Sequence, residues 1–358
     1  KEGMEMRLNI TYNVSPRRLL LDETVSKSLD KMRRAGVETI YLFGYFYGEF
    51  ESDPEHIAKA KKRLEEEGFT TGVINVPLGH GGNALDPDDP GINLEIGRGW
   101  RMTMDSSGRY RMNTTCIEDV MIEDTKKANM VFHEMGFRNY FNDDDLRLGQ
   151  WGPELQGCYC DYCMKEFDSI IGRKVTREEI ASMKNEELAE AWMDYQCVKI
   201  LRFLLETTPK GARNGIMVMH NGDRRHGIDI PLLRRHMPDN LVFRVGEAHF
   251  DDIAFSNKAG YDSIERSIKR HMALVGDYRI CYSETTCYPK NALSPENWIE
   301  KMKLEIKCGL RNLYLMSGAW FFEDPYWDAL EKSLAELRYL AETTEIPEYT
   351  MPEFTWVW

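Results

Sequence analysis

The sequence predicts an α/β protein built as a single (β/α)₈ barrel, and three observations support this fold class. Eight short runs rich in β-branched or aromatic residues alternate with longer segments of helical periodicity. The chain has 358 residues, enough for one barrel of about 250 residues with insertions. No domain-sized linker and no fixed-period repeat interrupts this alternation. A doubly wound open sheet is the structural alternative, but it rarely uses eight such even repeats.

Each expected strand is a short apolar run that ends near Gly, Asn, Asp or Glu. In chain order the strands are Arg7–Tyr12, Thr39–Phe43, Thr71–Val76, Arg138–Asn142, Ile216–His220, Leu241–Val245, Tyr278–Ser283 and Asn312–Met316. Barrel enzymes keep their active sites at the carboxyl ends of such strands, so functional residues are expected there.

The helices between the strands are recognised by their caps and breakers. The first runs from about Asp22 to Ala35 and stops at Gly36. The second opens at Asp53-Pro54-Glu55, an N-cap followed by proline in the first turn. The remaining helices are expected at Glu118–Met135, in a segment interrupted near Gly172 and Lys184, around Leu233, Ile264 and Ile299, and from about Tyr326 to Glu342.

Two insertions and a tail decorate the barrel, which we assign to residues 1–342. The loop 77–115 is rich in Gly, Pro and Asp, and a loop longer than about 15 residues is uncommon unless it is functional or disordered. Its segment Met104–Tyr110 is typical of a hairpin turn. The segment 150–190 carries a cysteine cluster, and residues 343–358 are expected to leave the barrel toward a further domain.

Charge and hydropathy exclude two classes of partner. The formal charge is −13, from 59 acidic against 46 basic residues, and a surface of that sign repels phosphate backbones. No stretch approaches the roughly 20 apolar residues that span a bilayer. We therefore expect neither a nucleic-acid nor a membrane partner. The sequence leaves a homo-oligomer open, and its cysteines do not decide the cellular compartment.

Polar and aromatic residues collect at the carboxyl ends of the expected strands. A single member of such a set is more often structural, for example a helix N-cap, but their convergence is harder to dismiss. Carboxylates, amides and aromatic rings suit sugars, which offer hydroxyl groups and apolar CH faces. We therefore expect a carbohydrate substrate, bound by Tyr45, His80, Arg147, Asn221, Asp223, Glu247, His249 and Trp320.

Glycoside hydrolysis needs two carboxyl groups that flank the scissile bond. Glu284 is the best candidate nucleophile because it is a solitary acidic residue at the end of a hydrophobic strand. The acid/base candidate lies in the run from Asp143 to Asp145, where adjacent carboxylates raise one another's pKa by repulsion. Asp145 is favoured because it shares the strand face of Asp143 one step nearer the opening, and Asp144 is a close second.

Three cysteines, Cys158, Cys160 and Cys163, fall within six residues. Structural zinc takes four N or S ligands, commonly Cys₄ or Cys₃His, and Cys116 is the expected fourth ligand because it leaves the same end of a neighbouring strand. We therefore expect a structural zinc ion in a Cys₄ site. Free thiols or a disulfide within the cluster are the alternatives.

This combination of cysteine spacing with a Glu that ends strand seven resembles family 42 β-galactosidases, which are retaining glycoside hydrolases of clan A. The resemblance covers roughly Arg7 to Trp320. It implies zinc ligation by the four cysteines, Glu284 as nucleophile and Trp320 as an aromatic platform for the sugar. The family places Asn-Glu after strand four, with the Glu as acid/base, whereas the matching place here reads Asp144-Asp145. The shorter side chain implies a shifted substrate, an altered mechanism or a divergent branch.

Three readings of function remain open at this point. The first is a retaining glycosidase, with a β-galactosidase-like exo-activity as the family-based expectation. The second is a catalytically divergent or inactive carbohydrate-binding barrel. The third is a metal-dependent hydrolase that uses His220, Asp223, Glu247 and His249, which is disfavoured because no His pair has the i, i+4 spacing of a metalloprotease helix.

Overall fold

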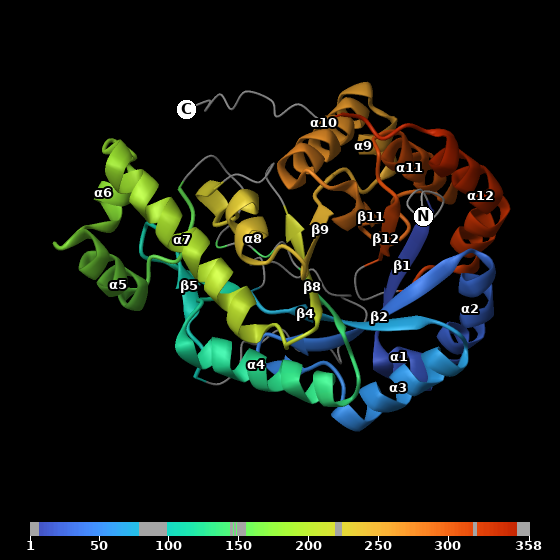
Figure 1. Cartoon of the computed structure of the whole chain (residues 1–358), viewed down its shortest axis with the longest axis horizontal. Coiled ribbons are helices and arrows are strands. Elements are labelled where there is room, and N and C mark those ends of the chain that lie inside the picture. The colour runs from blue at the N-terminus through green and yellow to red at the C-terminus, as the bar shows by residue number, and fades with distance from the viewer. Residues whose placement is uncertain are drawn as a thin grey trace.

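The computed structural model describes residues 7–78, 99–143, 146, 148, 155–218, 224–317 and 321–348. Its central feature is a closed sheet of eight parallel strands, so the predicted (β/α)₈ barrel is confirmed (Figure 1). In spatial order the strands are β1 (Asn9–Val14), β2 (Val37–Phe46), β4 (Thr70–Val76), β7 (Asn139–Asn142), β8 (Arg213–Val218), β9 (Leu241–Val245), β10 (Cys281–Tyr282) and β12 (Asn312–Met316). Strand β1 pairs with both β2 and β12, which closes the barrel.

Two short strands extend this sheet. Strand β3 (Glu49–Phe50) pairs antiparallel with β2, and β11 (Thr285–Thr286) runs parallel to β12 beyond the end of β10. The seventh barrel strand is shorter than the sequence predicted, because residues Tyr278–Ile280 form the 3₁₀ helix η4. The side chain of Asp277 accepts a hydrogen bond from the backbone N–H of Arg279 and so turns the chain before the strand begins.

Helices cover the outside of the barrel, and their caps are those expected from the sequence. Asp22 accepts from the backbone N–H of Thr24, and Asp53 accepts from that of Glu55 with Pro54 in the first turn. The helices are α1 (Pro16–Leu21), α2 (Glu23–Arg34), α3 (Pro54–Glu66), α4 (Asp119–Glu134), α8 (Ile230–His236), α9 (Asp252–Ser256), α10 (Lys258–Val275), α11 (Pro295–Lys307) and α12 (Asp324–Thr343), with the 3₁₀ helix η3 (Arg224–His226) before α8. None of the helices in the described ranges is long and apolar enough to cross a membrane.

The barrel interior is filled by aromatic side chains. The ring of Tyr41 stacks on that of Tyr314, with centroids 5.6 Å apart, and Phe141 meets the Tyr314 ring edge-on at 5.1 Å. Gly215 makes room for this packing, since a Cβ atom at that position would lie 2.2 Å from the Phe141 ring. The interior is therefore a packed core, as in other barrels of this size.

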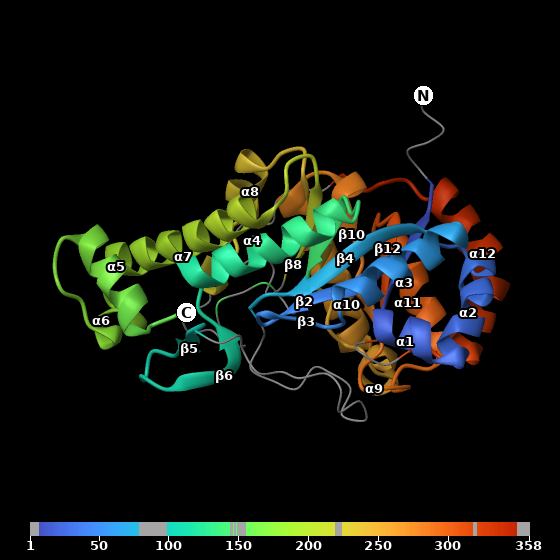
Figure 2. The same cartoon turned by 90° about the horizontal axis from the view of Figure 1, so that it is seen from below.

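A second, smaller core lies beside the barrel, where Figures 1 and 2 both show a projecting helical extension. It is built by the hairpin of β5 (Met102–Met104) and β6 (Tyr110–Thr115) with α5 (Asp161–Ile171), α6 (Arg177–Ala181) and α7 (Glu186–Thr207). The hairpin was predicted from the turn residues at 104–110, and the breaks between α5, α6 and α7 fall near Gly172 and Lys184 as expected. The core packs around Trp192, which stacks on Tyr159 at 4.5 Å.

Candidate active site and metal centre

Glu284 lies at the carboxyl end of barrel strand β10. The ring of Tyr282 points into the barrel, where its centroid is 6.5 Å from that of Phe141 and 6.5 Å from that of Tyr314. Successive residues of an extended chain alternate between faces, so Glu284 shares this inward face one layer nearer the opening. The side chains of Ser283 and Thr285 bond to each other on the opposite face. This placement agrees with the position predicted for a nucleophile.

The carboxylate of Glu284 is held by the turn that follows β9. Its Oε2 accepts from the backbone N–H of Glu247 at 2.6 Å and from that of Ala248 at 3.3 Å. In return, Oε1 of Glu247 accepts from the backbone N–H of Glu284 at 2.8 Å. The two residues therefore clamp each other, and backbone N–H donors stabilise the ionised form of the Glu284 carboxylate.

The turn that provides these donors has an unusual backbone. Ala248 and His249 both adopt positive φ angles, 57° and 58°, in the left-handed region that non-glycine residues rarely enter. Backbone strain of this kind persists where surrounding contacts impose it, and it often marks functional sites. Burial lowers the pKa of His249, and the positive charge of Lys301 lowers it further. His249 is therefore neutral near pH 7.

The other described candidates lie away from the inward face. The carboxylate of Glu247 is fully buried against α11, with Oε2 at 3.4 Å from Nζ of Lys301. Tyr45 packs its ring against Phe50 at 5.2 Å and Trp100 at 6.2 Å in the core outside the barrel, and burial raises its pKa to about 12. Glu247 therefore contacts Glu284 and α11, and Tyr45 is part of the hydrophobic core outside the barrel.

Several candidates fall on residues outside the described ranges. They are the acid/base candidates Asp144 and Asp145, the third reading's His220, and the sugar-binding candidates His80, Arg147, Asn221, Asp223 and Trp320. Of the acidic run, Asp143 is described, and its carboxylate points into the barrel toward Arg244 of β9.

Two polar groups near Glu284 were missed by the sequence reasoning. Lys301 and Glu305 are fully buried one turn apart on α11, on the same face as Trp298 and Met302. Two charged residues four positions apart within an apolar stripe are a readable signal, because Lys and Glu are almost never fully buried unless paired. Asn13 on β1 is also buried, and its amide has no hydrogen-bond partner among the described residues.

The four cysteines predicted to bind zinc come together beside the barrel. Cys116 precedes α4, Cys158 and Cys160 precede α5, and Cys163 lies in its first turn. All four are buried, and their sulfur atoms lie within 4.8 Å of one another. The Sγ distances from Cys116 to Cys163 and Cys160 are 3.4 and 3.9 Å, and Cys160 to Cys163 is 3.6 Å.

These distances fit a tetrahedral metal site. A zinc ion with Zn–S bonds of about 2.3 Å requires S–S separations of about 3.8 Å. Hydrogen bonds among the four sulfurs lower the pKa of Cys160 and Cys163 and raise the pKa of Cys116 and Cys158, so two of the four cysteines favour the thiolate, which is the form that binds metal. The residues present therefore fit a closed four-sulfur site.

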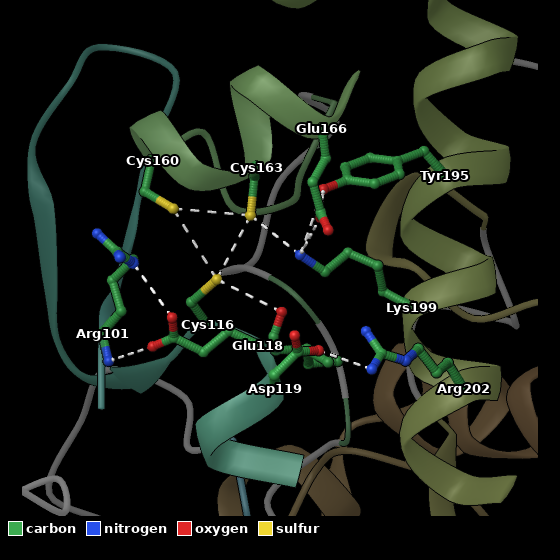
Figure 3. Close-up of polar contacts among 11 residues, drawn as sticks. Arg101, Cys116, Glu118, Asp119, Cys160, Cys163, Glu166, Tyr195, Lys199 and Arg202 are labelled. Atoms are coloured by element: carbon green, nitrogen blue, oxygen red, sulfur yellow. Dashed lines mark hydrogen bonds and ion pairs between the residues drawn. The ribbon is translucent and has the colours of Figure 1, made fainter. Parts of the chain in front are cut away.

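Charged groups surround this cluster, as Figure 3 shows. Lys199 of α7 places Nζ 3.1 Å from Sγ of Cys163 and 3.3 Å from the Tyr195 hydroxyl, with Glu166 at 3.5 Å. Burial opposes the charge on Lys199, but the nearby thiols of Cys163 and Cys116 outweigh it and raise the pKa of the ammonium. The sulfur cluster thus has a permanent cation beside it.

Comparison with known proteins identifies the fold. No protein-family model matches the sequence, and no curated protein matches it. The chain is similar to the catalytic domain of the β-amylase from Paenibacillus polymyxa, with a TM-score of 0.61 and 11% identity over 93% of this chain and 99% of that one. It is also similar to the glycoside hydrolase domain of PgaB (BpsB) from Bordetella bronchiseptica, with a TM-score of 0.56 and 10% identity over 96% and 100%.

A third similar structure is the GH42 β-galactosidase Gan42B, with a TM-score of 0.60 and 11% identity over 95% of this chain and 58% of that one. These neighbours are glycoside hydrolases. The chain spans about three fifths of the length of Gan42B and of the Marinomonas ef1 β-galactosidase, of which it covers 61%. At such low identity the likeness establishes the barrel fold alone.

Proposed function

We propose that this chain is a glycoside hydrolase that cleaves a glycosidic bond with two carboxylates, and that Glu284 is its nucleophile. The observation that carries the proposal is the reciprocal clamp between Glu284 and Glu247 at the mouth of the barrel. A nucleophile must be ionised and held in one orientation, and backbone N–H donors meet both requirements. The glycoside hydrolase neighbours support the same reaction class.

The acid/base partner we propose is Asp145, with Asp144 as the alternative. In a retaining reaction Glu284 attacks the anomeric carbon while the acid protonates the departing glycosidic oxygen. The resulting ester between Glu284 and the sugar is then hydrolysed by a water molecule. The acid/base residue, which has given up its proton in the first step, deprotonates this water. The substrate class we propose is a β-galactoside or related sugar, cleaved from the chain end, in line with the resemblance to family 42.

The cysteine cluster supports this reaction indirectly. Cys116, Cys158, Cys160 and Cys163 would hold one zinc ion as a structural site, since four thiolates leave no open position for substrate or water. Such a site would join the segment before α4 to the segment that follows strand β7 and the acidic run. Its role would be to stabilise the chain around the acid/base candidates.

The test combines a measurement of glycoside turnover with covalent labelling of the nucleophile. Wild type and Glu284→Gln are assayed against a panel of aryl glycosides, with Glu296→Gln on the exposed first turn of α11 as control. We expect Glu284→Gln to lose turnover by about 10³-fold or more while Glu296→Gln keeps it. A 2-fluoro glycoside should label wild type by the mass of one sugar, at the peptide that contains Glu284.

Two results would reject the nucleophile assignment. One is turnover that survives in Glu284→Gln, and the other is a sugar label on a peptide without Glu284. Sugar binding without turnover in the folded wild type would instead indicate a carbohydrate-binding barrel. Loss of turnover on chelation in a protein that stays folded would indicate a metal-dependent hydrolase.

A further inference from the structure

A cluster of charged side chains lies buried behind Glu284, between the end of β9 and α11. The side chains of Lys301 and Glu247 are fully shielded from solvent, and Glu305 is likewise buried. Burying charged groups is unfavourable unless they are paired and hydrogen-bonded. The contacts of each member therefore indicate what the cluster does.

Lys301 connects α11 to both sides of the Glu284 clamp. Its Nζ donates to the backbone carbonyl of Glu284 at 2.9 Å and lies 3.4 Å from Oε2 of Glu247. It also lies 5.2 Å from the centroid of the Phe250 ring, in the turn after β9. One ammonium group thus holds the strand end that carries Glu284 and the turn that donates to its carboxylate.

Glu305 connects α11 to β12 through a chain of hydrogen bonds. The donor and the acceptor of each bond in this chain can be assigned. Thr285 Oγ1 donates to Oε2 of Glu305 at 2.7 Å. A hydroxyl group has one proton to give, so the 2.6 Å contact between Ser283 and Thr285 must be donated by Ser283. The hydroxyl of Ser283 in turn accepts from the backbone N–H of Tyr314 on β12 at 2.9 Å.

The last step of this chain joins two carboxyl groups. Burial and the neighbouring Glu247 raise the pKa of Glu305 well above its ordinary value and so favour its protonated form. Oε1 of Glu305 has no hydrogen-bond donor among the described residues, and Oε2 of Glu247 has there only its 3.4 Å ion-pair contact with Lys301. A proton on Oε1 of Glu305 would give both atoms a hydrogen-bond partner, because the acid would donate it to Glu247.

We propose that Glu247, Lys301 and Glu305 are positioning residues that fix the backbone and carboxylate of Glu284, with Glu305 donating a hydrogen bond to Glu247. The hydrogen bonds link β12 to Ser283 and Thr285, and Thr285 to Glu305 on α11. The proposed bond from Glu305 to Glu247 then leads back to the carboxylate of Glu284. The catalytic consequence rests on the proposed function. The three residues would hold the backbone of Glu284 in place whether or not the proposed function is correct.

The catalytic test uses four variants in the full chain. Glu247→Gln places an amide donor against the ammonium of Lys301, and we expect kcat to fall about 10²-fold with KM changed less than about threefold. Glu305→Leu should behave similarly, whereas Glu305→Gln keeps a donor for Glu247 and an acceptor for Thr285 and should restore most of kcat. Glu300→Gln is the matched control, because Glu300 lies on the exposed face of the same helix.

A second measurement is independent of turnover. Hydrogen exchange at the backbone N–H of Glu284, which donates to Glu247, should be at least tenfold faster in Glu247→Gln and Glu305→Leu than in wild type. Lys301→Met removes the ammonium and should likewise speed this exchange; if it fails to fold, the double variant Glu247→Gln/Lys301→Met, which removes both charges, is compared instead. Wild-type kcat and wild-type exchange in Glu247→Gln would overturn the proposal, as would equal losses in Glu305→Gln and Glu305→Leu.

These outcomes separate the two proposals. If wild type cleaves no glycoside, the proposed function fails, and the exchange rates still decide whether the three residues position Glu284. If Glu284 proves to be the nucleophile but Glu247→Gln is unaffected in both measurements, the positioning proposal alone fails.

Discussion

Arg244 and Asp143 form an ion pair inside the barrel, with Nη2 of the arginine 2.5 Å from Oδ1 of the aspartate. The guanidinium lies over the rings of Phe141 and Tyr314, at 5.7 and 5.4 Å from their centroids. Within the described part of the aromatic interior, Arg244 is thus a strand-borne cation whose counterion is the first residue of the acidic run. Because the carboxylate of Asp143 already has this partner, we keep Asp144 and Asp145 as the proposed acid/base candidates.

Arg244→Met should destabilise the protein by about 3 kcal/mol, because it leaves a carboxylate without its partner in a largely buried site. Urea denaturation followed by tryptophan fluorescence measures this loss. The double variant Asp143→Asn/Arg244→Met should recover a substantial part of it, since both charges are then absent. If the losses in Asp143→Asn and Arg244→Met simply add in the double variant, the ion pair contributes no coupling energy.

The barrel was predictable because its signals are local and repeat eight times. Caps such as Asp22 and Asp53 and the apolar run Leu241–Val245 specify their elements without help from distant residues. The seventh strand shows where this fails. Its predicted first half, Tyr278–Ile280, has strand-like composition, but the Asx turn at Asp277 makes it a 3₁₀ helix.

Removal of metal should loosen the smaller core, because the cysteine cluster lies at its centre. We expect about one zinc per chain by elemental analysis, and a melting temperature lower by about 5 °C or more after chelation. Cys163→Ser should lose the zinc, whereas Cys197→Ala should keep it, since Cys197 lies on α7 with its sulfur facing the carbonyl of Arg224. Metal-free protein whose eight thiols all react at once in the native state would contradict this prediction.

Lys199 should tune this site without binding the metal. Four thiolates around Zn²⁺ carry a net charge of −2, and the ammonium 3.1 Å from Cys163 offsets part of it. Lys199→Met should weaken zinc affinity by about tenfold in a competition with a chromogenic chelator. Arg202→Met is the control, because Arg202 lies one turn further along α7 and pairs with Asp119 and Glu206 instead. Equal affinities in the two variants would show that the Lys199 contact is incidental.

The site was less predictable than the fold, for a physical reason. The place of Glu284 at the end of strand β10 could be predicted from sequence because a lone acidic residue ends an apolar run. Glu247 was assigned to substrate because sequence position does not reveal which face of a strand end a side chain occupies, and its carboxylate turns outward to α11. Lys301 and Glu305 become meaningful only once the fold brings α11 beside the ends of β9 and β10.

Glu305 gives the stability of the protein a pH dependence of known sign. Its pKa is raised in the folded state above the ordinary value of 4.5, by burial first and by Glu247 second. Above that value the unfolded chain has released the proton that the folded chain still binds, so stability falls as pH rises toward the folded-state pKa. Below about pH 4.5 both states are protonated and the penalty disappears.

Glu305→Gln removes this titration while keeping a neutral group of the same shape. Above about pH 5 and up to the folded-state pKa, the unfolding free energy of wild type should therefore fall more steeply with pH than that of Glu305→Gln, by up to about 1.4 kcal/mol per pH unit. Urea titrations of both proteins at matched pH values give the difference directly, because the other titrating groups are common to both. Parallel pH profiles would mean that Glu305 is ionised in the folded protein, and the hydrogen bond from Glu305 to Glu247 would then have no proton to form it.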